Sequence, residues 1–398
     1  MTTQPIALVL AGGGMRGAYE AGVLSALGPE LDRRGERIEI IAGTSIGCWN
    51  GAVFASQAHR SMSEAADALV DFWGQLGYRA LLEPVAPTVG HLLLAGLPPQ
   101  PLRTVLDTTP MGPTLRRLID FDQLARNVDD RTGPLTATAF VATSYATTRS
   151  VVFHAGRAKP QPSGEPIDYI ETSLRDVHVR ASSAIQAAFP AVNVPGPDGT
   201  AHWYGDGGAR LNFPLEPALA MGAKSVIAIG LNSGVTLATD VMESEPFVSD
   251  GSAQMQQIAL DDQLRTNIAW LSSTDGAQAT PYIFVAPQDR FAIGRIARDV
   301  YNRFYTGEDG LRRDPDVALL GRIYRAGDSL TNGEHCSYLF PAREFIQELI
   351  ALGRADANDW LSAAHTDGPW QVGTSQPRTG STDATDILVG TRAVASDR

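Results

Sequence analysis

Cysteines, positive charge and long hydrophobic runs are all scarce in this sequence. Cys48 and Cys336 are the only cysteines among 398 residues. Two are too few for a disulfide framework and fit a reducing compartment. We expect both to be small, buried or half-buried thiols, and nothing in the sequence suggests a metal site.

The balance of charge disfavours several classes of partner. The formal net charge is −12, which argues against nucleic acid and against simple electrostatic docking onto an anionic membrane. Any contact with lipid should therefore be mainly apolar. Hydrophobic residues make up 43% of the chain and charged residues 19%, as in a globular protein with a sizeable core.

No segment has the pattern of a leader or a membrane span. Residues 6–10 are an apolar run of strand length that ends at three glycines, whereas a signal peptide begins with basic residues. The apolar stretch at 91–97 is far shorter than the roughly 18–20 residues that span a bilayer. We expect a soluble, cytoplasmic protein that makes at most transient contact with a membrane or micelle surface.

Hydrophobic periodicity predicts an α/β fold with a mostly parallel sheet. A strand is expected at 6–10 and a helix at 15–27, which Gly28-Pro29 would end. A second strand at 38–42 leads into a turn and a helix at 48–56. Further strands are expected at 136–143, 150–154, 202–204, 225–230 and 282–285.

Four regions follow from this pattern. Residues 6–230 carry the motifs described below. Residues 231–365 are expected to complete the same globule, with a separate small domain as the alternative. Within this second region the helical spacing of Phe345, Ile346, Leu349 and Ile350 indicates core packing rather than membrane contact. Residues 81–113, rich in Pro, Gly and Leu, form either a loop packed on the core or a lid. The polar composition of 366–398 predicts a mobile tail.

The first motif is a glycine run after the first strand. Its residues are Gly12, Gly13, Gly14, Met15, Arg16 and Gly17. A dinucleotide fingerprint fits this spacing, but the second strand ends in Ile41-Ala42-Gly43 instead of the acid that would bind ribose. Free N–H groups at a helix start stabilise an oxyanion, and Gly13 and Gly14 are the best donors. Arg16 would hold the loop, contact an acidic group of the substrate or form a structural salt bridge.

The second motif places Ser45 in a sharp turn between a strand and a helix. Gly43 and Gly47 flank it in the GxSxG pattern of a nucleophile elbow, although a serine here also suits a helix cap. In an ordinary α/β-hydrolase the nucleophile follows several strands and precedes an acid and a histidine. Ser45 follows a single β-α-β unit, so a different serine-hydrolase frame is expected.

The third motif is Asp206, followed by Gly207 and Gly208. Asp-Gly alone indicates a turn, but together with the other motifs it predicts a carboxylate base within roughly 2.6–3.2 Å of the Ser45 hydroxyl. Burial would raise its pKa toward working pH. His202 lies four residues earlier and on the same side of a strand, yet a structural role is expected for it, as for His154 and His178.

These motifs, in this order, resemble those of the patatin-like phospholipase family over residues 6–230. Two further stretches resemble family blocks, at 181–190 and 212–215. Ala11 departs from plant members, which commonly have aspartate there. The resemblance implies a three-layer α/β/α fold in which Ser45 is the nucleophile, Asp206 the base and the glycine run the oxyanion hole.

The function implied by this resemblance is a lipid acyl hydrolase without metal or cofactor. Phospholipid, lysophospholipid and monoacylglycerol are all expected substrate classes, and Ser45 would carry the acyl group. A thioesterase or acyltransferase with the same Ser–Asp dyad is one alternative. The other is a lipid-binding protein that keeps the fold with negligible chemistry.

Overall fold

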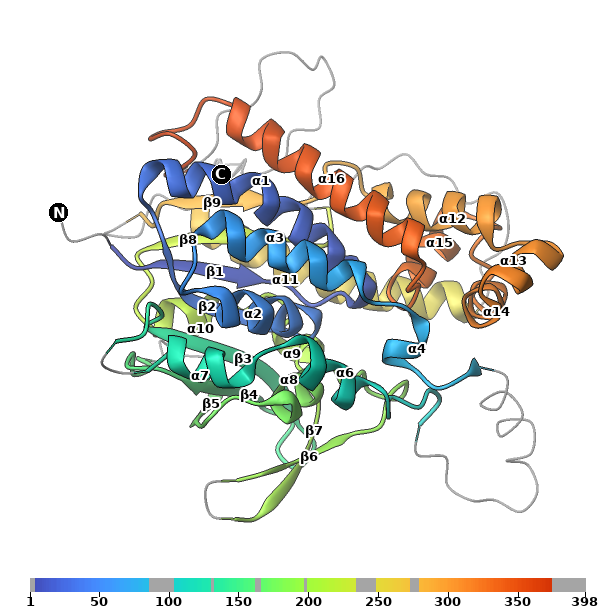
Figure 1. Ribbon diagram of the computed structural model, residues 1–398, viewed down its shortest axis with the longest axis horizontal. Helices are drawn as coiled ribbons and strands as arrows, with labels where there is room; N and C mark the ends of the chain where they lie inside the picture. The colour runs from blue at the N-terminus through green and yellow to red at the C-terminus, as the bar shows by residue number, and fades with distance from the viewer. Residues whose placement is uncertain are drawn as a thin grey trace, which may run out of the picture.

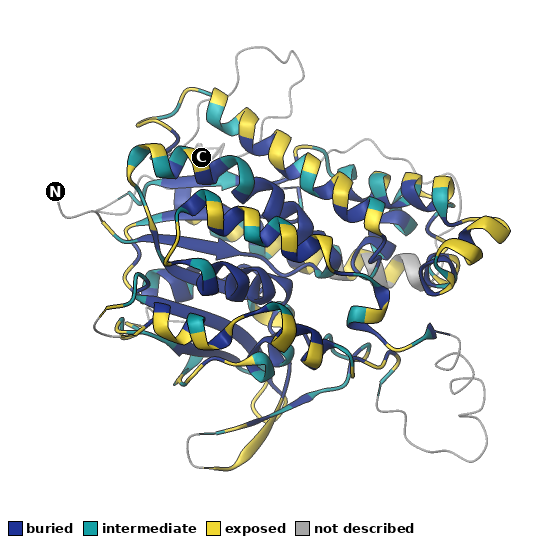
Figure 2. Ribbon diagram, in the orientation of Figure 1, coloured by how far each residue is buried: buried dark blue, intermediate teal, exposed yellow. Residues whose placement is uncertain are grey.

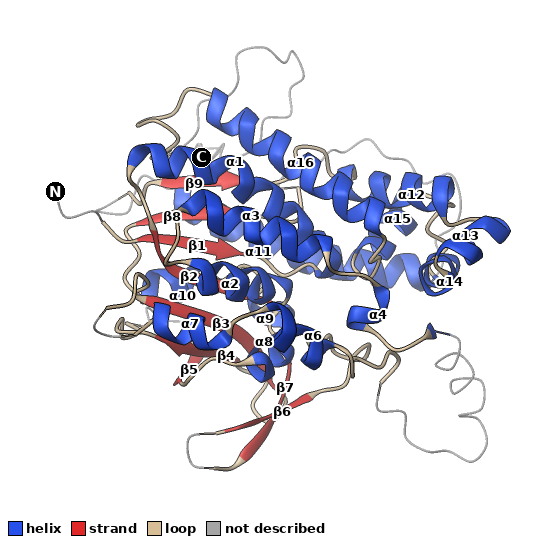
Figure 3. Cartoon of the chain, in the orientation of Figure 1, coloured by secondary structure: helices blue, strands red, loops and turns tan. Residues whose placement is uncertain are grey.

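Nine strands form one sheet in the residues that the structure describes. The computed structural model describes residues 4–85, 104–129, 132–161, 166–196, 199–233, 248–272 and 279–373. The strands are β1 (Ile6–Leu10), β2 (Ile38–Thr44), β3 (Ala137–Ser144), β4 (Ser150–Ala155), β5 (Ile167–Glu171), β6 (Val192–Pro195), β7 (Ala201–Asp206), β8 (Ser225–Ile229) and β9 (Tyr282–Val285). Seven strands follow the order β5-β4-β3-β2-β1-β8-β9. Strand β7 pairs with both β3 and β6, and the hairpin of β6 and β7 extends from the sheet in Figure 3.

Most neighbouring strands run parallel. The pairs β1–β2, β1–β8, β2–β3, β4–β5 and β8–β9 are parallel, whereas β3–β4, β3–β7 and β6–β7 are antiparallel. The central strands are buried along nearly their whole length (Figure 2), because helices cover the sheet on both sides. The predicted three-layer α/β fold with a mostly parallel sheet is confirmed.

The helices in the described residues are short, apart from three long ones. They are η1 (Gly14–Gly17), α1 (Ala18–Arg34), α2 (Ile46–Gln57), α3 (Met62–Gly74), α4 (Tyr78–Leu81), α6 (Met111–Leu118), α7 (Phe121–Asn127), α8 (Asp176–Ser182), α9 (Gly208–Leu211), α10 (Leu215–Ala220), α11 (Val248–Ser272), α12 (Ala292–Phe304), α13 (Gly307–Arg313), α14 (Pro315–Ile323), α15 (Leu330–Ser337) and α16 (Arg343–Ser362). Figure 1 shows α1, α2, α3 and α16 on the face of the sheet toward the viewer.

The first helix is longer than the sequence predicted. Gly28-Pro29 was expected to end it, but α1 continues to Arg34 and ends at Gly35, whose φ of 68° is left-handed. Proline inside a helix removes a backbone hydrogen bond and costs about 3 kcal/mol. Leu31, which is fully buried on the following turn, offsets that cost, and glycine at the left-handed position provides the actual stop.

The chain after residue 230 contributes to the same sheet and core. β9 pairs with β8, and α16 packs against α1 so closely that a Cβ on Gly22 would lie 2.1 Å from the Ile350 carbonyl oxygen. Phe345, Ile346 and Leu349 are buried, which confirms the prediction of core packing for this stripe.

The first residues of the segment expected to be a mobile tail contact the globule. Residues 366–373 pack against the globule: Trp370 is buried and donates a hydrogen bond to Glu36, and Gln371 forms a bridge with Tyr282. A single buried tryptophan supplies the apolar contact that the polar composition obscured. Residues 374–398 lie outside the described residues.

The segment at 81–113 is described only in part. Residues 86–103, which include most of the suggested lid, lie outside the described residues. On either side of that gap Leu82, Val85 and Leu106 are buried, so the described ends pack on the core. None of the described helices combines the length and the apolar character that crossing a bilayer would require.

Candidate active site

Ser45 lies in a tight turn between β2 and α2. Its backbone has φ 54° and ψ −119°. Residues other than glycine rarely adopt this conformation, and where they do it is typically at functional sites. The flanking glycines allow the close approach that the turn requires. A Cβ on Gly43 would lie 2.4 Å from the Gly47 carbonyl oxygen, and a Cβ on Gly47 would lie 2.4 Å from that of Leu10.

The Ser45 hydroxyl donates a hydrogen bond to Asp206 at the end of β7. Oγ of Ser45 lies 2.5 Å from Oδ2 of Asp206, and the Gly208 amide donates to Oδ1 at 2.7 Å. The exposed fractions of Ser45 and Asp206 are 5% and 7%. Burial raises the pKa of Asp206 to about 6, while the hydrogen bonds from Ser45 and Gly208 oppose this rise.

Strand β3 brings these two residues together. Thr44, just before the serine, pairs with Val141 on one side of β3. Asp206 pairs with the next residue, Ala142, on the same side of β3, because β4 occupies the opposite side there. Because Val141 and Ala142 are adjacent, the register of one strand sets the separation of the two side chains, which are 161 positions apart in the sequence.

The glycine loop lies beside the serine and presents two free amides. The Gly12 amide donates to the Asn212 carbonyl at 3.0 Å, and Nδ2 of Asn212 donates back to the Gly12 carbonyl at 3.1 Å. Within the described part of the chain, the amides of Gly13 and Gly14 have no acceptor. These two N–H groups are therefore free to donate to a ligand.

Arg16 is placed differently from the sequence expectation that it belongs to an oxyanion hole. Its side chain is fully buried, and Nη1 lies 2.9 Å from Oε1 of Glu334. Its amide donates to the Gly13 carbonyl at 3.3 Å. Neither group is free for a substrate, because the side chain forms the structural salt bridge that was one of its expected roles. Gly17 packs directly against a neighbouring side chain, because a Cβ there would lie 2.5 Å from Ile46.

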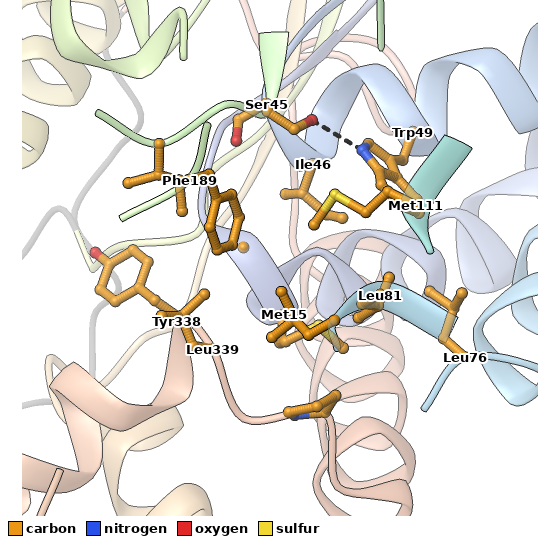
Figure 4. Close-up of a pocket in the computed structure, with 15 residues that line it drawn as sticks. Met15, Ser45, Ile46, Trp49, Leu76, Leu81, Met111, Phe189, Tyr338 and Leu339 are labelled. Carbon is orange, nitrogen blue, oxygen red and sulfur yellow. Dashed lines mark hydrogen bonds between the residues drawn. The ribbon is translucent and has the colours of Figure 1, made fainter. Parts of the chain in front are cut away.

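An apolar cavity opens at Ser45 (Figure 4). It holds about 520 Å³ of empty space, some of it open to solvent, and its lining is almost entirely hydrophobic. Its lining residues are Gly14, Met15, Ser45, Ile46, Trp49, Leu76, Leu81, Leu82, Met111, Ser183, Ile185, Phe189, Tyr338, Leu339 and Pro341. Such a space accepts a hydrocarbon chain and offers little to a polar ligand.

The last residue of α8 and the segment that follows it contact both members of the pair and were not assigned a role from the sequence. Oγ of Ser182 accepts a hydrogen bond from the Ser45 amide at 2.8 Å. The Ala184 carbonyl accepts from the Asp206 amide at 2.8 Å, and Nε2 of Gln186 donates to the Asp206 carbonyl at 2.9 Å. This segment therefore positions the backbone of both residues.

The histidines considered from the sequence lie apart from this pair. His202 is exposed on the hairpin and contacts Oγ1 of Thr200 at 2.8 Å. His154 and His178 are buried on β4 and α8, where burial lowers the pKa of both and that of His178 to about 4. Across the described residues, no group of three His, Cys, Asp or Glu side chains is arranged to hold a metal ion.

Comparison with known proteins identifies related sequences. The family model described as patatin-like phospholipase matches residues 8–219. Human patatin-like phospholipase domain-containing protein 6 is 29% identical over 235 residues, which are 58% of this chain and 14% of that protein. Lysophospholipase nte1 of Aspergillus terreus is 39% identical over 88 residues, or 22% of this chain and 5% of that protein. The chain thus spans a small part of the length of these relatives.

Solved structures give weaker similarities. Human GIVD cytosolic phospholipase A2 is 10% identical with a TM-score of 0.37, covering 89% of this chain and 59% of that chain. VipD from Legionella pneumophila is 12% identical with a TM-score of 0.29, covering 71% and 61%. Both TM-scores are low.

Proposed function

The chain belongs to the patatin-like phospholipase family, and we propose that it is a lipid acyl hydrolase that cleaves carboxylic esters through an acyl-Ser45 intermediate. The observation that carries this proposal is the 2.5 Å hydrogen bond from Ser45 to buried Asp206 at one end of an apolar cavity. A lipid or other acyl ester is the partner that this cavity suits.

The proposed acylation step begins with proton transfer from Ser45 to Asp206. Oγ of Ser45 attacks the ester carbonyl carbon. The carbonyl oxygen of the ester becomes an oxyanion, which the amides of Gly13 and Gly14 stabilise. The tetrahedral intermediate collapses, the bond to the leaving alcohol breaks, and Asp206 returns the proton to that alcohol. The acyl group then remains on Ser45.

Deacylation repeats these steps with water. Asp206 takes a proton from the water as it attacks the acyl carbonyl; the bond between the acyl carbon and Oγ of Ser45 then breaks, Asp206 returns the proton to Oγ, and the carboxylic acid leaves. The pKa of about 6 supports this role, because Asp206 is ionised at neutral pH yet basic enough to accept a proton. No step in this scheme requires a metal or a cofactor.

An alkyl fluorophosphonate tests the nucleophile. We expect it to label wild-type protein at Ser45, located by mass spectrometry, and to label Asp206→Asn at least about a hundredfold more slowly. Asp122→Asn is the matched control, because this aspartate is exposed and pairs with Arg175. Absence of labelling in folded wild type, or labelling that is unaffected in Asp206→Asn, would contradict the mechanism.

Turnover of acyl esters then tests the reaction class. Release of fatty acid from lysophospholipid, phospholipid or monoacylglycerol supports hydrolysis, and Ser45→Ala should abolish it. A new ester formed when an alcohol acceptor is added would instead show acyl transfer, and preference for a thioester would show a thioesterase. Tight binding of lipid with no turnover would replace the enzyme proposal with that of a lipid-binding protein.

A further inference from the structure

The guanidinium of Arg16 ties the glycine loop to α15, beyond the residues that the family model matches. Besides its ion pair with Glu334, Nη2 donates to the Glu334 carbonyl at 2.7 Å and Nε donates to Oγ of Ser337 at 2.8 Å. Its Cζ lies 3.7 Å from the centre of the Tyr338 ring. Arg16 is fully buried and Glu334 is 4% exposed, so solvent screens this pair little.

The backbone makes a second connection at the same place. The Met15 amide donates to the Tyr338 carbonyl at 3.0 Å. A Cβ on Gly14 would lie 2.1 Å from that carbonyl oxygen, and Gly14 has a left-handed φ of 58°. The Tyr338 carbonyl therefore lies directly against one of the two glycines whose amides are free.

The residues that follow α15 also form one wall of the cavity. Tyr338, Leu339 and Pro341 line it together with Ser45 and Met15. Figure 4 shows Tyr338 and Leu339 on the side of the cavity that lies across from Trp49 and Met111. One short segment thus contacts both the loop that would hold the oxyanion and the space that would hold the acyl chain.

We propose that residues 334–341 are a positioning and specificity segment of the active site. Glu334 holds the glycine loop in place through Arg16, and Leu339 limits the length of the acyl chain that the cavity accepts. This inference rests on the proposed function. It assigns roles to residues that lie more than a hundred positions beyond the matched region, which ends at residue 219.

Glu334→Gln tests the positioning role. The substitution keeps the shape of the side chain but leaves the buried Arg16 without its counter-charge. We expect kcat to fall about tenfold or more for esters of every chain length while KM changes little, because an oxyanion donor acts mainly in the transition state. Glu344→Gln is the matched control, since Glu344 also pairs with an arginine, Arg313, but lies away from the loop.

Leu339→Trp tests the specificity role and remains informative if Glu334→Gln fails to fold. With p-nitrophenyl esters of 4, 8, 12 and 16 carbons, we expect kcat/KM for the 16-carbon ester to fall at least about tenfold relative to the 4-carbon ester, because the larger ring shortens the cavity. Leu311→Trp is the control, because Leu311 is 43% exposed on α13.

The outcomes separate this inference from the proposed function. If wild type hydrolyses none of the esters, the proposed function fails. If wild type is active but folded Glu334→Gln keeps the kcat of Glu344→Gln, the positioning role is wrong. If Leu339→Trp has the chain-length profile of wild type, the specificity role is wrong. A uniform fall in kcat for the first variant and a loss of long chains for the second support the proposal.

Discussion

Replacing Asp206 with asparagine should make the protein more stable at neutral pH. The carboxylate is buried, and its pKa is raised from 3.8 to about 6, so the folded state binds this proton more tightly than the unfolded chain does. Asparagine has nearly the same shape and carries no charge: its oxygen still accepts from the Gly208 amide, and its NH2 group donates to the Ser45 hydroxyl, which can act as the acceptor. The variant therefore removes the free-energy cost of ionising a buried group.

The sign and size of this effect follow from linkage. Below about pH 3.8 the carboxyl is protonated in both states and costs nothing; as pH rises through the folded pKa, ionisation progressively destabilises the folded state. At about 1.4 kcal/mol per pKa unit, the shift from 3.8 to about 6 corresponds to about 3 kcal/mol by pH 8. Asp206→Asn should thus gain up to that amount at pH 8 and almost none near pH 4.

Urea unfolding at several pH values measures this difference. Wild type, Asp206→Asn and Asp122→Asn are compared from pH 4 to pH 8 by the free energy of unfolding. Arg175 holds the pKa of exposed Asp122 below its usual range, so the control should lose a little stability rather than gain it. If Asp206→Asn shows the same pH dependence as wild type, burial does not raise the pKa of Asp206 and the reasoning is wrong.

Three further predictions concern the same site. The kcat/KM of wild type should fall about tenfold per pH unit below pH 6 as Asp206 becomes protonated, and a flat profile down to pH 4 would exclude it as the base. Ser182→Ala should lower kcat about tenfold and move the acidic limb of the pH–rate profile to higher pH, because a displaced Ser45 no longer lowers the pKa of Asp206. The control Ser272→Ala removes a buried hydroxyl that bonds only within its own helix and should change neither quantity. Equal effects of the two substitutions would refute a specific role for Ser182. Gly47→Ala should destabilise folding by at least about 2 kcal/mol in thermal unfolding, because its Cβ would meet backbone at 2.4 Å, and an unchanged midpoint would show that the turn can relax.

The sequence predicted those elements whose signals are local. Apolar runs located β1, β8 and β9 to within a residue, and glycine spacing indicated the tight turn at Ser45. Pro29 misled the prediction of the first helix, because packing of Leu31 outweighs the local preference. Strands β5 and β6 were missed, since they are short and lie at an edge or in a hairpin where no continuous apolar run is needed.

The parts of the site that the sequence left open depend on distant contacts. Arg16 had three equally reasonable roles until its partner Glu334, far along the chain, was known. Ser182 and Asn212 lie in stretches that resemble family blocks, but only the structure shows their hydrogen bonds to Ser45 and Gly12. No periodicity or composition encodes such pairings.

The connection between Arg16 and α15 has a consequence for how the protein is made. Ser337 follows Arg16 by 321 positions, and at about 5–20 residues per second a ribosome needs roughly 16–64 s to synthesise that stretch. During this time the nascent chain already carries Ser45, but its glycine loop lacks the contacts that α15 provides. The loop that the proposed reaction needs is therefore fixed in this way only after nearly the whole described chain has been translated.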